Sequence, residues 1–456
     1  MLSERSPTAT DSPDAAPWEQ SPTATDSPDA APWERSPTAT DSPDAALWER
    51  SPTATDSPDA ALWERSPTAT RRDLHTILCH IVSFLRDPKE ELLPMQPVKY
   101  GVIGCGVIGP THMKPAATTD VLDLVAVADL IPERAHKAAE AYNVPKVYGP
   151  GLDLIADPEI ELVVLAMPTC HRKALALAAF AAGKHVLTEK PVAMNAEDVE
   201  DLIAARGNLK AACCSSRYRF ITHHQVAADF IASGALGELR EVYMRSFFPA
   251  GAAPTEPRPE WRLKRHLNGG GFLMNWGCYD LDYLMGLTGW QLQPEKCFAQ
   301  TWQIPSHIAW HIPEGSDAET QYTALIRCAG GTILSVERGE YMPLAGESAW
   351  QIIGTKGSLR LTMTAVTASG PKASASASNW KQILYDELTE DKGTVSTVLW
   401  EGEEDLAMVS AGPVTDLAQA IREDRDPKTT LEQALVVQKI TDAIYASAAA
   451  GDAVAV

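Results

Sequence analysis

The sequence is poor in positive charge. Across 456 residues, 39 lysines and arginines are outnumbered by 60 aspartates and glutamates, which gives a formal net charge of −21 at pH 7. Nucleic acids are bound through basic patches that neutralise their phosphates. The charge balance therefore argues against nucleic acid as a partner, and equally against an anionic membrane surface.

Long apolar runs and paired cysteines are also missing. The most apolar stretch near the N-terminus, residues 74–85, is about a dozen residues long and contains two histidines, whereas a membrane-spanning helix needs roughly 20 apolar residues. This stretch also lies too far from Met1 for a signal peptide. None of the eight cysteines forms a C-x-x-C pair, so neither a zinc site nor a disulfide framework is expected. We expect a cytoplasmic protein with free thiols and no bound metal.

The first 70 residues form an internal repeat. The segment SPTATDSPDAAPWER recurs with small changes in residues 6–20, 21–35, 36–50 and 51–65, and a fifth copy begins at Ser66. Each copy offers one Trp for burial, which cannot offset chain entropy, so we expect disorder. A tail that displays its tryptophans to a partner is the alternative. Residues 71–94 are expected to form a linker or a short helix, and Met95 is the expected native start.

From Val98 onwards, short apolar strands alternate with helical segments. Strands are expected at residues 98–103, 122–129, 162–167 and 185–188, and helices from the end of a glycine loop to about residue 118, at residues 132–142 and at residues 171–182. Strands that alternate with helices predict an α/β domain with a doubly wound parallel sheet. We assign this domain to residues 95–217.

After about residue 217 the pattern changes. Apolar and polar side chains alternate in residues 319–328, and Gly330-Gly331 then precedes residues 332–338, which predicts a hairpin. Residues 239–248 and 350–363 are further expected strands, and residues 430–449 an amphipathic helix. We therefore predict a second α/β domain over residues 218–456, with a large, mostly antiparallel sheet that helices cover on one face only.

A glycine loop follows the first expected strand. Residues 104–109 are GCGVIG, a G-x-G-x-x-G pattern whose glycines permit a tight turn, close approach to a pyrophosphate and tight helix–strand packing, beside a helix N-terminus that attracts phosphates. Asp129 lies 20 residues beyond Gly109, where a carboxylate accepts hydrogen bonds from a ribose 2′-OH. NAD is therefore favoured over NADP, which the nearby Arg134 keeps open. A glycine turn without a ligand is the alternative.

The segment AAGKHVLTEKPVA, residues 181–193, resembles the signature of the Gfo/Idh/MocA oxidoreductases, a family that includes glucose–fructose oxidoreductase and inositol dehydrogenase. Further matching pieces are VADLIPERA, LAMPTCHRKAL, WR at residues 261–262, GGGFLMNWGCYDLDYL, IIGTKGSLRL and IYASAAAGDAV, so the resemblance covers about residues 98–454. It implies a Rossmann domain followed by an α/β domain whose open sheet often mediates oligomerisation. A homo-oligomer, dimer or tetramer, is expected on this ground.

The resemblance implies catalytic roles for two residues. The family's E-K-P lysine, which serves in catalysis beside the nicotinamide, corresponds to Lys190, and a lysine with a pKa lowered by partial burial can relay a proton. The family's D-x-G-x-H-x-x-D element is N-W-G-C-Y-D-L-D here. Asn275 replaces the Asp and can only position substrate, because an amide cannot take a proton. Tyr279 replaces the His and becomes the candidate proton donor, with a pKa lowered by Lys190.

Alternatives remain for these residues. Taken without the motif around it, Lys190 is equally consistent with an ordinary surface lysine. Tyr279 is likewise consistent with a residue that only packs against its neighbours. His171 follows the strand at residues 162–167 and lies where such folds bind cofactors, or else caps its own helix. The adjacent His223 and His224 do not share a helical face, so no metal site is expected.

The complete set of expected site residues is as follows. Cofactor contacts are expected from Gly104, Cys105, Gly106, Val107, Ile108, Gly109, Asp129, Arg134, Pro168, Thr169, His171, Glu189 and Lys190. Substrate contacts are expected from Arg217, Arg219, Trp261, Arg262, Asn275, Tyr279 and Asp282; the arginines and Trp261 fit surface ion pairs or packing equally well.

Together these features predict an NAD(P)-dependent dehydrogenase acting on CH–OH groups. It would transfer hydride between the nicotinamide and a small-molecule substrate, a sugar, polyol or related cyclic alcohol, with Lys190 and Tyr279 handling the proton. One alternative is an NAD-dependent glycosidase that works through transient oxidation. Another is a non-catalytic regulator that senses NAD or a sugar, although such a protein would be expected to lose Lys190.

Overall fold

The computed structural model describes residues 96–252, 254, 263–363, 366–367, 370–371 and 379–456. The repeat, the segment 71–94, Trp261 and Arg262 lie outside these residues, so the expectations for them stay predictions. No helix in the described ranges combines the length and apolar character that a membrane crossing requires.

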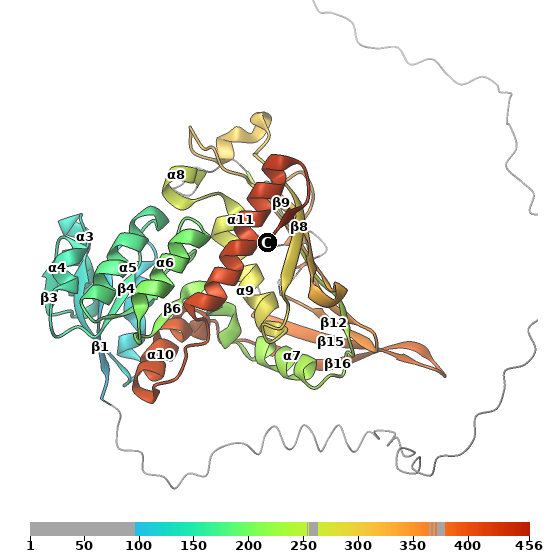
Figure 1. The fold of residues 1–456 in the computed structure, drawn as a ribbon, viewed down its shortest axis with the longest axis horizontal. Helices are drawn as coiled ribbons and strands as arrows, with labels where there is room; N and C mark the ends of the chain where they lie inside the picture. Colours follow the sequence, from blue (N-terminus) through green and yellow to red (C-terminus); the bar gives the residue numbers. More distant parts are fainter. Residues whose placement is uncertain (1–95, 253, 255–262, 364–365, 368–369, 372–378) are drawn as a thin grey trace, which may run out of the picture. The chain divides into compact units, whose positions relative to one another are not determined.

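The first sheet is parallel and six-stranded, with the strand order β3-β2-β1-β4-β5-β6 (Figure 1). Its strands are β1 Val98–Ile103, β2 Leu122–Ala128, β3 Lys146–Tyr148, β4 Leu162–Leu165, β5 His185–Thr188 and β6 Ala211–Cys213. In this order, ligands bind outside the carboxyl ends of the strands, where the strand order reverses between β1 and β4. The predicted doubly wound sheet is confirmed. β3 and β6, which have three residues each, are too short to give a recognisable apolar pattern.

Helices connect these strands. They are α2 Gly109–Met113, α3 Pro132–Tyr142, α4 Gly151–Ile155, α5 Arg172–Ala181 and α6 Ala196–Arg206, with 3₁₀ turns at Lys114–Ala117 and Thr169–His171. The helix predicted up to about residue 118 consists of two consecutive segments, because α2 ends after five residues and a 3₁₀ helix continues to Ala117. Pro115 accounts for the change from α-helix to 3₁₀ helix, since proline has no N–H to donate.

The second sheet has nine strands, in the order β16-β15-β12-β11-β7-β10-β9-β8-β17. Their bounds are β7 Leu239–Pro249, β8 Pro294–Trp302, β9 Gln321–Cys328, β10 Ile333–Met342, β11 Glu347–Gly354, β12 Gly357–Leu361, β15 Trp380–Thr389, β16 Gly393–Glu403 and β17 Val454–Ala455; β13 Val366–Thr367 and β14 Gly370–Pro371 pair separately. β7 and β10 run parallel, and the other neighbours are antiparallel. The predicted mostly antiparallel sheet is confirmed.

One predicted strand in this sheet is wrong. Residues 350–363 were expected to form a single strand, but β11 ends at Gly354 and β12 begins at Gly357, and the two pair as an antiparallel hairpin. The turn is held from outside, because the backbone N–H groups of Thr355 and Lys356 donate to the carbonyls of Glu238 and Leu236. That long-range contact has no signature in the local sequence.

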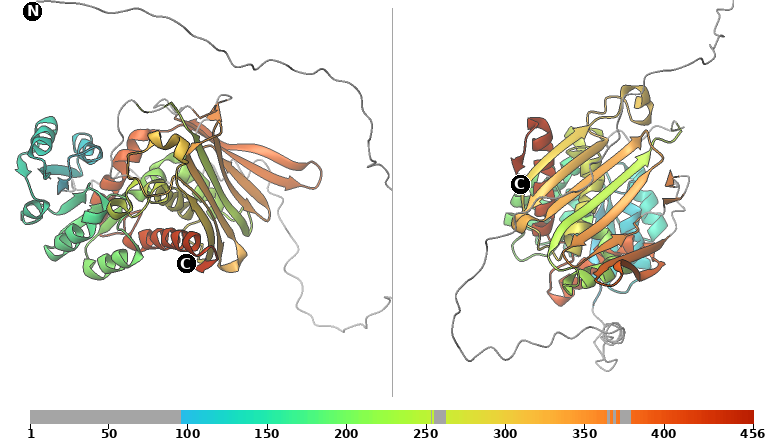
Figure 2. Two further views of the ribbon diagram at one scale, coloured as in Figure 1. Left: turned by 90° about the horizontal axis from the view of Figure 1, so that it is seen from above. Right: turned by 90° about the vertical axis from the view of Figure 1, so that its right-hand side faces the viewer.

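Helices cover one face of the second sheet. These are α7 Thr222–Ala232, α9 Cys278–Leu287 and α11 Leu431–Ala450, while the smaller helical segments are α8 Arg265–Asn268, a π-helix at Leu273–Gly277 and 3₁₀ turns at Cys214–Phe220, Ser306–His311 and Ala329–Gly331. On β9, Tyr322 and Ala324 are fully buried on the covered face, as the alternation predicted, and Leu325 is half exposed on the other. Figure 2, in its right-hand view, looks onto the face that carries no helix.

The last two helices return to the first sheet. α10 Leu406–Glu423 contributes Val414 and Leu417 to the core beneath β1, and α11 contributes Leu431 and Ala434 to the core on the other side. The N-terminus of α11 carries a capping box, in which Thr430 and Gln433 satisfy each other's backbone N–H groups. The C-terminal segment therefore packs against both sheets.

Candidate functional site

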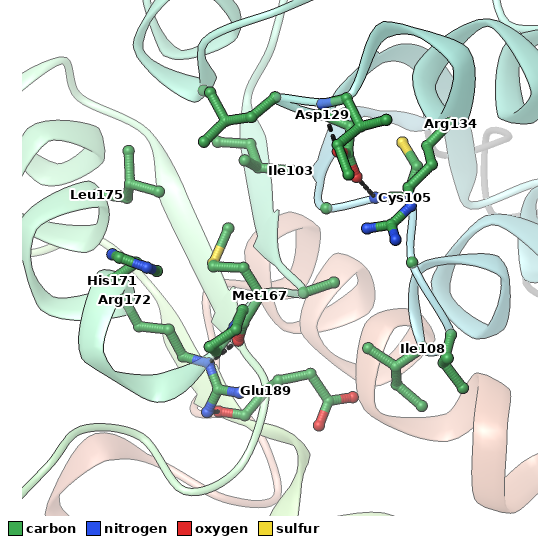
Figure 3. A pocket seen from close by; sticks show the side chains of 18 of the residues that line it. Ile103, Cys105, Ile108, Asp129, Arg134, Met167, His171, Arg172, Leu175 and Glu189 are labelled. Carbon is green, nitrogen blue, oxygen red and sulfur yellow. Dashed lines mark hydrogen bonds between the residues drawn. The ribbon is translucent and has the colours of Figure 1, made fainter. Parts of the chain in front are cut away.

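A cavity of about 1480 Å³ lies at the carboxyl ends of the first sheet's strands (Figure 3). Its wall is built from the glycine loop after β1, the segments that follow β2, β4 and β5, and residues of the second domain. The loop, Asp129, Pro168, Lys190 and Tyr279 all line this one space. Residues separated by up to 175 positions in the sequence are thus brought together by the strand order.

The glycine loop has three glycines with three different surroundings. Gly104 has a φ of +100°, and a Cβ there would lie 2.5 Å from the carbonyl oxygen of Ala166. A Cβ on Gly109 would lie 2.3 Å from the carbonyl oxygen of Gly104, whereas one on Gly106 would meet nothing within 4 Å. Gly104 and Gly109 therefore permit the turn, and Gly106 leaves the cavity side of the loop open. This arrangement fits a pyrophosphate that lies against the backbone.

Asp129 is held against this loop. Its Oδ2 accepts a hydrogen bond from the backbone N–H of Cys105 at 2.8 Å, and its Oδ1 accepts one from the N–H of Ile131 at 2.9 Å. Burial, together with the charge of Asp129, raises the pKa of the Cys105 thiol to about 12. Asp129 and Arg134 both line the cavity, as Figure 3 shows.

Lys190 follows β5 and is held by the second domain. Its Nζ donates to the backbone carbonyl of Asn275 at 2.6 Å and to the Asn275 Oδ1 at 2.7 Å. Asn275 lies in the π-helix, a rare geometry that is frequent at functional sites. Burial lowers the pKa of Lys190, which is the direction expected from the sequence. Asn275, expected to position substrate, is thus in contact with the lysine.

The expectation that Lys190 lowers the pKa of Tyr279 is wrong. Burial, followed by the charge of Glu189, raises the pKa of Tyr279 well above its ordinary value. The Lys190 ammonium lies over the ring face, 4.7 Å from its centroid, where it makes a cation–π contact. Tyr279 therefore stays a neutral hydrogen-bond donor.

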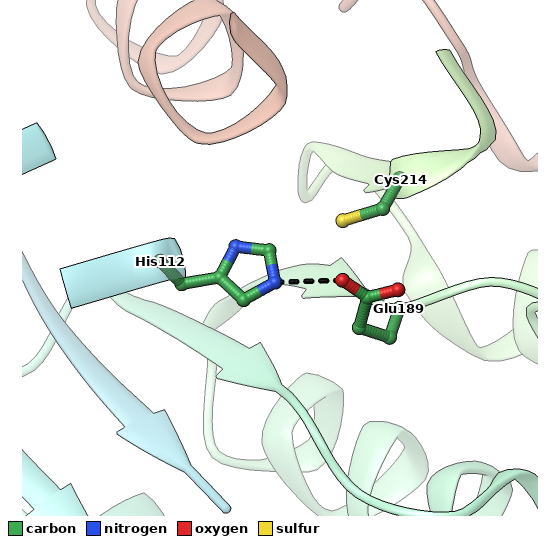
Figure 4. Close-up of side chains that lie close together, drawn as sticks. All are labelled: His112, Glu189 and Cys214. Atoms are coloured by element: carbon green, nitrogen blue, oxygen red, sulfur yellow. Dashed lines mark hydrogen bonds and ion pairs between the residues drawn. The ribbon is translucent and has the colours of Figure 1, made fainter. Parts of the chain in front are cut away.

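A buried polar cluster that includes His112 and Glu189 (Figure 4) holds the backbone of Lys190. Glu189 Oε1 lies 2.8 Å from His112 Nε2 and is also paired with Arg217, and Glu189 Oε2 accepts the backbone N–H of Lys190 at 3.1 Å. Although burial raises the pKa of Glu189, Arg217 and His112 lower it, and the net direction is downward. Glu189 is therefore an ionised carboxylate inside the protein.

The same cluster contains metal-type ligands. Ligand atoms of His112, Glu189 and Cys214 lie within 4.8 Å of one another (Figure 4). Arg217 already neutralises the carboxylate, and burial raises the pKa of the Cys214 thiol well above its ordinary value. Because metal ligands must be deprotonated, this donor set fits an ion-pair cluster better than a metal site.

Several sequence-predicted residues do not line the cavity. Arg217 is paired with Glu189, and Thr169 is buried and donates to Asn268 Oδ1 at 2.9 Å. Asp282 has no exposed surface and accepts hydrogen bonds from the hydroxyls of Ser215 and Thr429, and Arg219 lies 3.7 Å from it. The expected substrate roles of Arg219 and Asp282 are thus corrected to a buried network that joins the helices. Gly109, as described, serves the turn.

Other expected residues do line it. They are Gly104, Cys105, Gly106, Val107, Ile108, Asp129, Arg134, Pro168, His171, Glu189, Lys190, Asn275 and Tyr279. The alternative that His171 caps its helix is wrong, because its side chain makes no capping hydrogen bond. The role of each residue toward a ligand stays a prediction.

Four site residues were missed by the sequence analysis. Arg172 lines the cavity, donates to the carbonyls of Met167 and Glu189 and also contacts that of Pro191. Asn268 and Trp276 also line the cavity, and His112 lies behind it. Trp276 stands next to Asn275 in the recognised element, so its position was a usable signal. Arg172 lies in the matching piece LAMPTCHRKAL, so it too had a usable signal, whereas Asn268 and His112 have no local signature.

Two family models match the chain. One, described as an oxidoreductase family with an NAD-binding Rossmann fold, matches residues 98–216, and the other, described as the GFO/IDH/MocA C-terminal domain, matches residues 224–360. Together they cover more than half of the chain.

Curated relatives match at modest identity. Levoglucosan dehydrogenase of Pseudarthrobacter phenanthrenivorans is 26% identical over 300 residues, which is 58% of this chain and 73% of the relative. Trans-1,2-dihydrobenzene-1,2-diol dehydrogenase of Mus musculus is 28% identical over 205 residues, 44% of this chain and 59% of the relative. For several relatives the match spans only 45% to 59% of their length.

Solved structures share the fold. Levoglucosan dehydrogenase in complex with NADH and L-sorbose has a TM-score of 0.66 at 22% identity, covering 79% of this chain and 99% of that one. Aldose–aldose oxidoreductase from Caulobacter crescentus in complex with glycerol has a TM-score of 0.64 at 23% identity, and the match covers 79% of this chain and 100% of that one. At these identities the likeness shows a common fold.

Proposed function

The chain belongs to the Gfo/Idh/MocA oxidoreductase family, and on that premise we propose that it is an NAD-dependent dehydrogenase of a cyclic sugar or related cyclic alcohol. One observation carries the proposal: a single cavity is lined both by the glycine loop with Asp129 and by Lys190 with Tyr279. The first pair of features suits a dinucleotide, and the second suits an alcohol that must lose a proton.

The cofactor half of the cavity supports NAD. The loop at Gly104–Gly106 leaves room for a pyrophosphate against the backbone, and the Asp129 carboxylate suits a ribose 2′-OH while repelling a 2′-phosphate. Arg134 and Lys137 line the same cavity, and their positive charge favours NADP. When bound, the cofactor supplies a nicotinamide ring that accepts hydride from the substrate carbon.

We propose that Lys190 takes the proton from the substrate hydroxyl. Burial lowers the pKa of Lys190, so a larger fraction is neutral near pH 7 than for an exposed lysine. Asn275 fixes the position of its Nζ through two acceptor oxygens. Because burial raises the pKa of Tyr279, that residue donates a hydrogen bond to the substrate oxygen and keeps its own proton.

Two observations support the proposed substrate class: the substrates of the relatives and the aromatic side chains that line the cavity. The relatives named above act on levoglucosan and on a dihydrobenzene diol, both of which are cyclic, and aromatic side chains line the cavity beside Lys190. The family resemblance leads us to propose a homo-oligomer as well.

The test is a substrate screen with purified protein. NAD and a panel of pyranoses, 1,6-anhydro sugars, inositols and dihydrodiols are mixed with the chain, and the absorbance of reduced nicotinamide is recorded. We expect reduction with at least one cyclic alcohol, and a lower KM for NAD than for NADP. Release of free sugar from glycosides without net reduction would establish the glycosidase alternative instead.

A further inference from the structure

Asn268, a residue of the cavity wall, has an unused hydrogen-bond donor. It is the last residue of α8, has 2% of its surface exposed and lines the same cavity as Lys190. Its Oδ1 accepts a hydrogen bond from Thr169 Oγ1 at 2.9 Å, which directs the Nδ2 group the other way. Within the described part of the chain, Nδ2 has no hydrogen-bond partner. A buried amide without a partner is costly, so an acceptor oxygen of a ligand is the partner that this group lacks.

Trp276 presents an aromatic surface to the same cavity. Trp276 lines the wall together with Asn275 and Tyr279, and its ring centroid lies 5.8 Å from that of Tyr279. The Arg338 guanidinium lies over the indole, 4.9 Å from the ring centroid, and is itself held by the buried Asp280 at 2.9 Å. The indole is thus supported by a fixed ion pair. Such a rigid, flat apolar surface suits the C–H face of a sugar ring.

We propose that Asn268 and Trp276 form the substrate subsite, in which the indole packs against one face of a pyranose ring and the Asn268 amide donates a hydrogen bond to a hydroxyl oxygen of that ring. This proposal rests on the proposed function. It identifies the part of the active site that selects a cyclic sugar. Asn268 and Trp276 act in binding, while Lys190 acts on the reacting hydroxyl.

The test measures sugar binding rather than turnover. D-glucose, D-galactose, D-mannose and levoglucosan are titrated calorimetrically into the chain at saturating NADH and mildly alkaline pH. Asn268→Asp keeps the acceptor for Thr169 and removes the donor, so we expect sugar affinity to fall about ten-fold. Asn195→Asp is the matched control, because Asn195 Oδ1 also accepts one hydrogen bond, from Asp198 N–H, and Asn195 does not line the cavity. We expect the control to bind sugar as the wild type does.

Deoxy sugars identify the hydroxyl concerned. For the sugar that binds, one monodeoxy derivative should bind the wild type about ten-fold more weakly and should bind the Asn268→Asp variant no worse than the parent sugar does. Thr169→Val should give a smaller loss, and Thr169→Ser should restore affinity. Trp276→Ala should weaken pyranose binding by about ten-fold, whereas Trp276→Phe should retain most of it.

Three results would overturn the subsite. The first is that no pyranose binds the wild type, the second is that Asn268→Asp and Trp276→Ala bind sugar normally, and the third is that Asn268→Asp loses affinity for NADH and not for sugar. The last result would assign Asn268 to the cofactor. If pyranoses bind in the predicted way but are never oxidised, the subsite stands and the proposed dehydrogenase activity fails.

Discussion

Replacement of Glu189 by glutamine is a demanding test of the cluster behind Lys190. The carboxylate is 2% exposed and is shared by His112, Arg217 and the backbone of Lys190. Removing one partner from a buried ion pair costs about 3–5 kcal/mol, because the other charge is left uncompensated. A glutamine oxygen still accepts one hydrogen bond, so we expect a loss near 3 kcal/mol in the free energy of unfolding.

The same change moves the pH dependence of turnover in a definite direction. Burial lowers the pKa of Lys190, the charges of Arg217 and Arg172 lower it further, and the Glu189 carboxylate raises it. Without that carboxylate, the pKa of Lys190 falls. Alcohol oxidation needs the neutral lysine, so the acid limb of the rate profile should move to lower pH, by about one unit for each 1.4 kcal/mol of lost interaction.

Two measurements follow from this variant. Urea unfolding gives the stability, and the initial rate of NAD reduction across pH gives the acid limb. Glu159→Gln is the matched control, because Glu159 pairs with Lys99 and Lys146 at a solvent-accessible site, where solvent screens the ion pair and its loss should change the stability little. A Glu189→Gln protein as stable as the control, or an acid limb that moves to higher pH, would refute the assignment of Glu189 as an ionised, buried counter-charge.

Three further outcomes are expected. Lys190→Arg keeps a cation beside Asn275 but cannot release a proton, so kcat should fall about 10²–10⁴-fold in the reduction assay while calorimetry shows unchanged NADH affinity. Burial lowers the pKa of His223 to about 4 and that of His224 to about 3. Below about pH 6.5 the unfolded chain therefore binds more protons than the folded chain does. The urea concentration at the midpoint of unfolding should fall as the pH is lowered from 6.5 toward 4, and it should fall less steeply in His224→Gln. Asp282→Asn should lower the free energy of unfolding by about 1–3 kcal/mol and leave kcat/KM unchanged. A raised KM would instead support the substrate contact expected for Asp282 from the sequence.

The nucleotide half of the site was predictable because its determinants are local. The glycine loop, the strand before it and Asp129 lie within one stretch of about thirty residues, and parallel strand order brings the later strand ends to the same edge. Lys190 and Tyr279 were assigned from the family resemblance. Their presence on one cavity wall agrees with that assignment, although their roles remain proposals.

The missed and misassigned features depend on contacts between distant segments. Whether Asp282 faces a substrate or a buried network is decided by Thr429, 147 positions away. The direction of the Tyr279 pKa shift depends on burial by the surrounding elements, which outweighs the lowering effect of the Arg217 charge. Asn268 gave no signal, because its unused donor is apparent only once Thr169 and the cavity are in place.

The most direct test of the central claim is an experimental structure with NAD and a bound pyranose. We predict the pyrophosphate against the backbone of Gly104–Gly106, the adenosine ribose within hydrogen-bond distance of Asp129, and a sugar hydroxyl oxygen within about 3 Å of Lys190 Nζ. A dinucleotide bound elsewhere, or a sugar whose hydroxyls all lie beyond the reach of Lys190, would contradict the proposed dehydrogenase site.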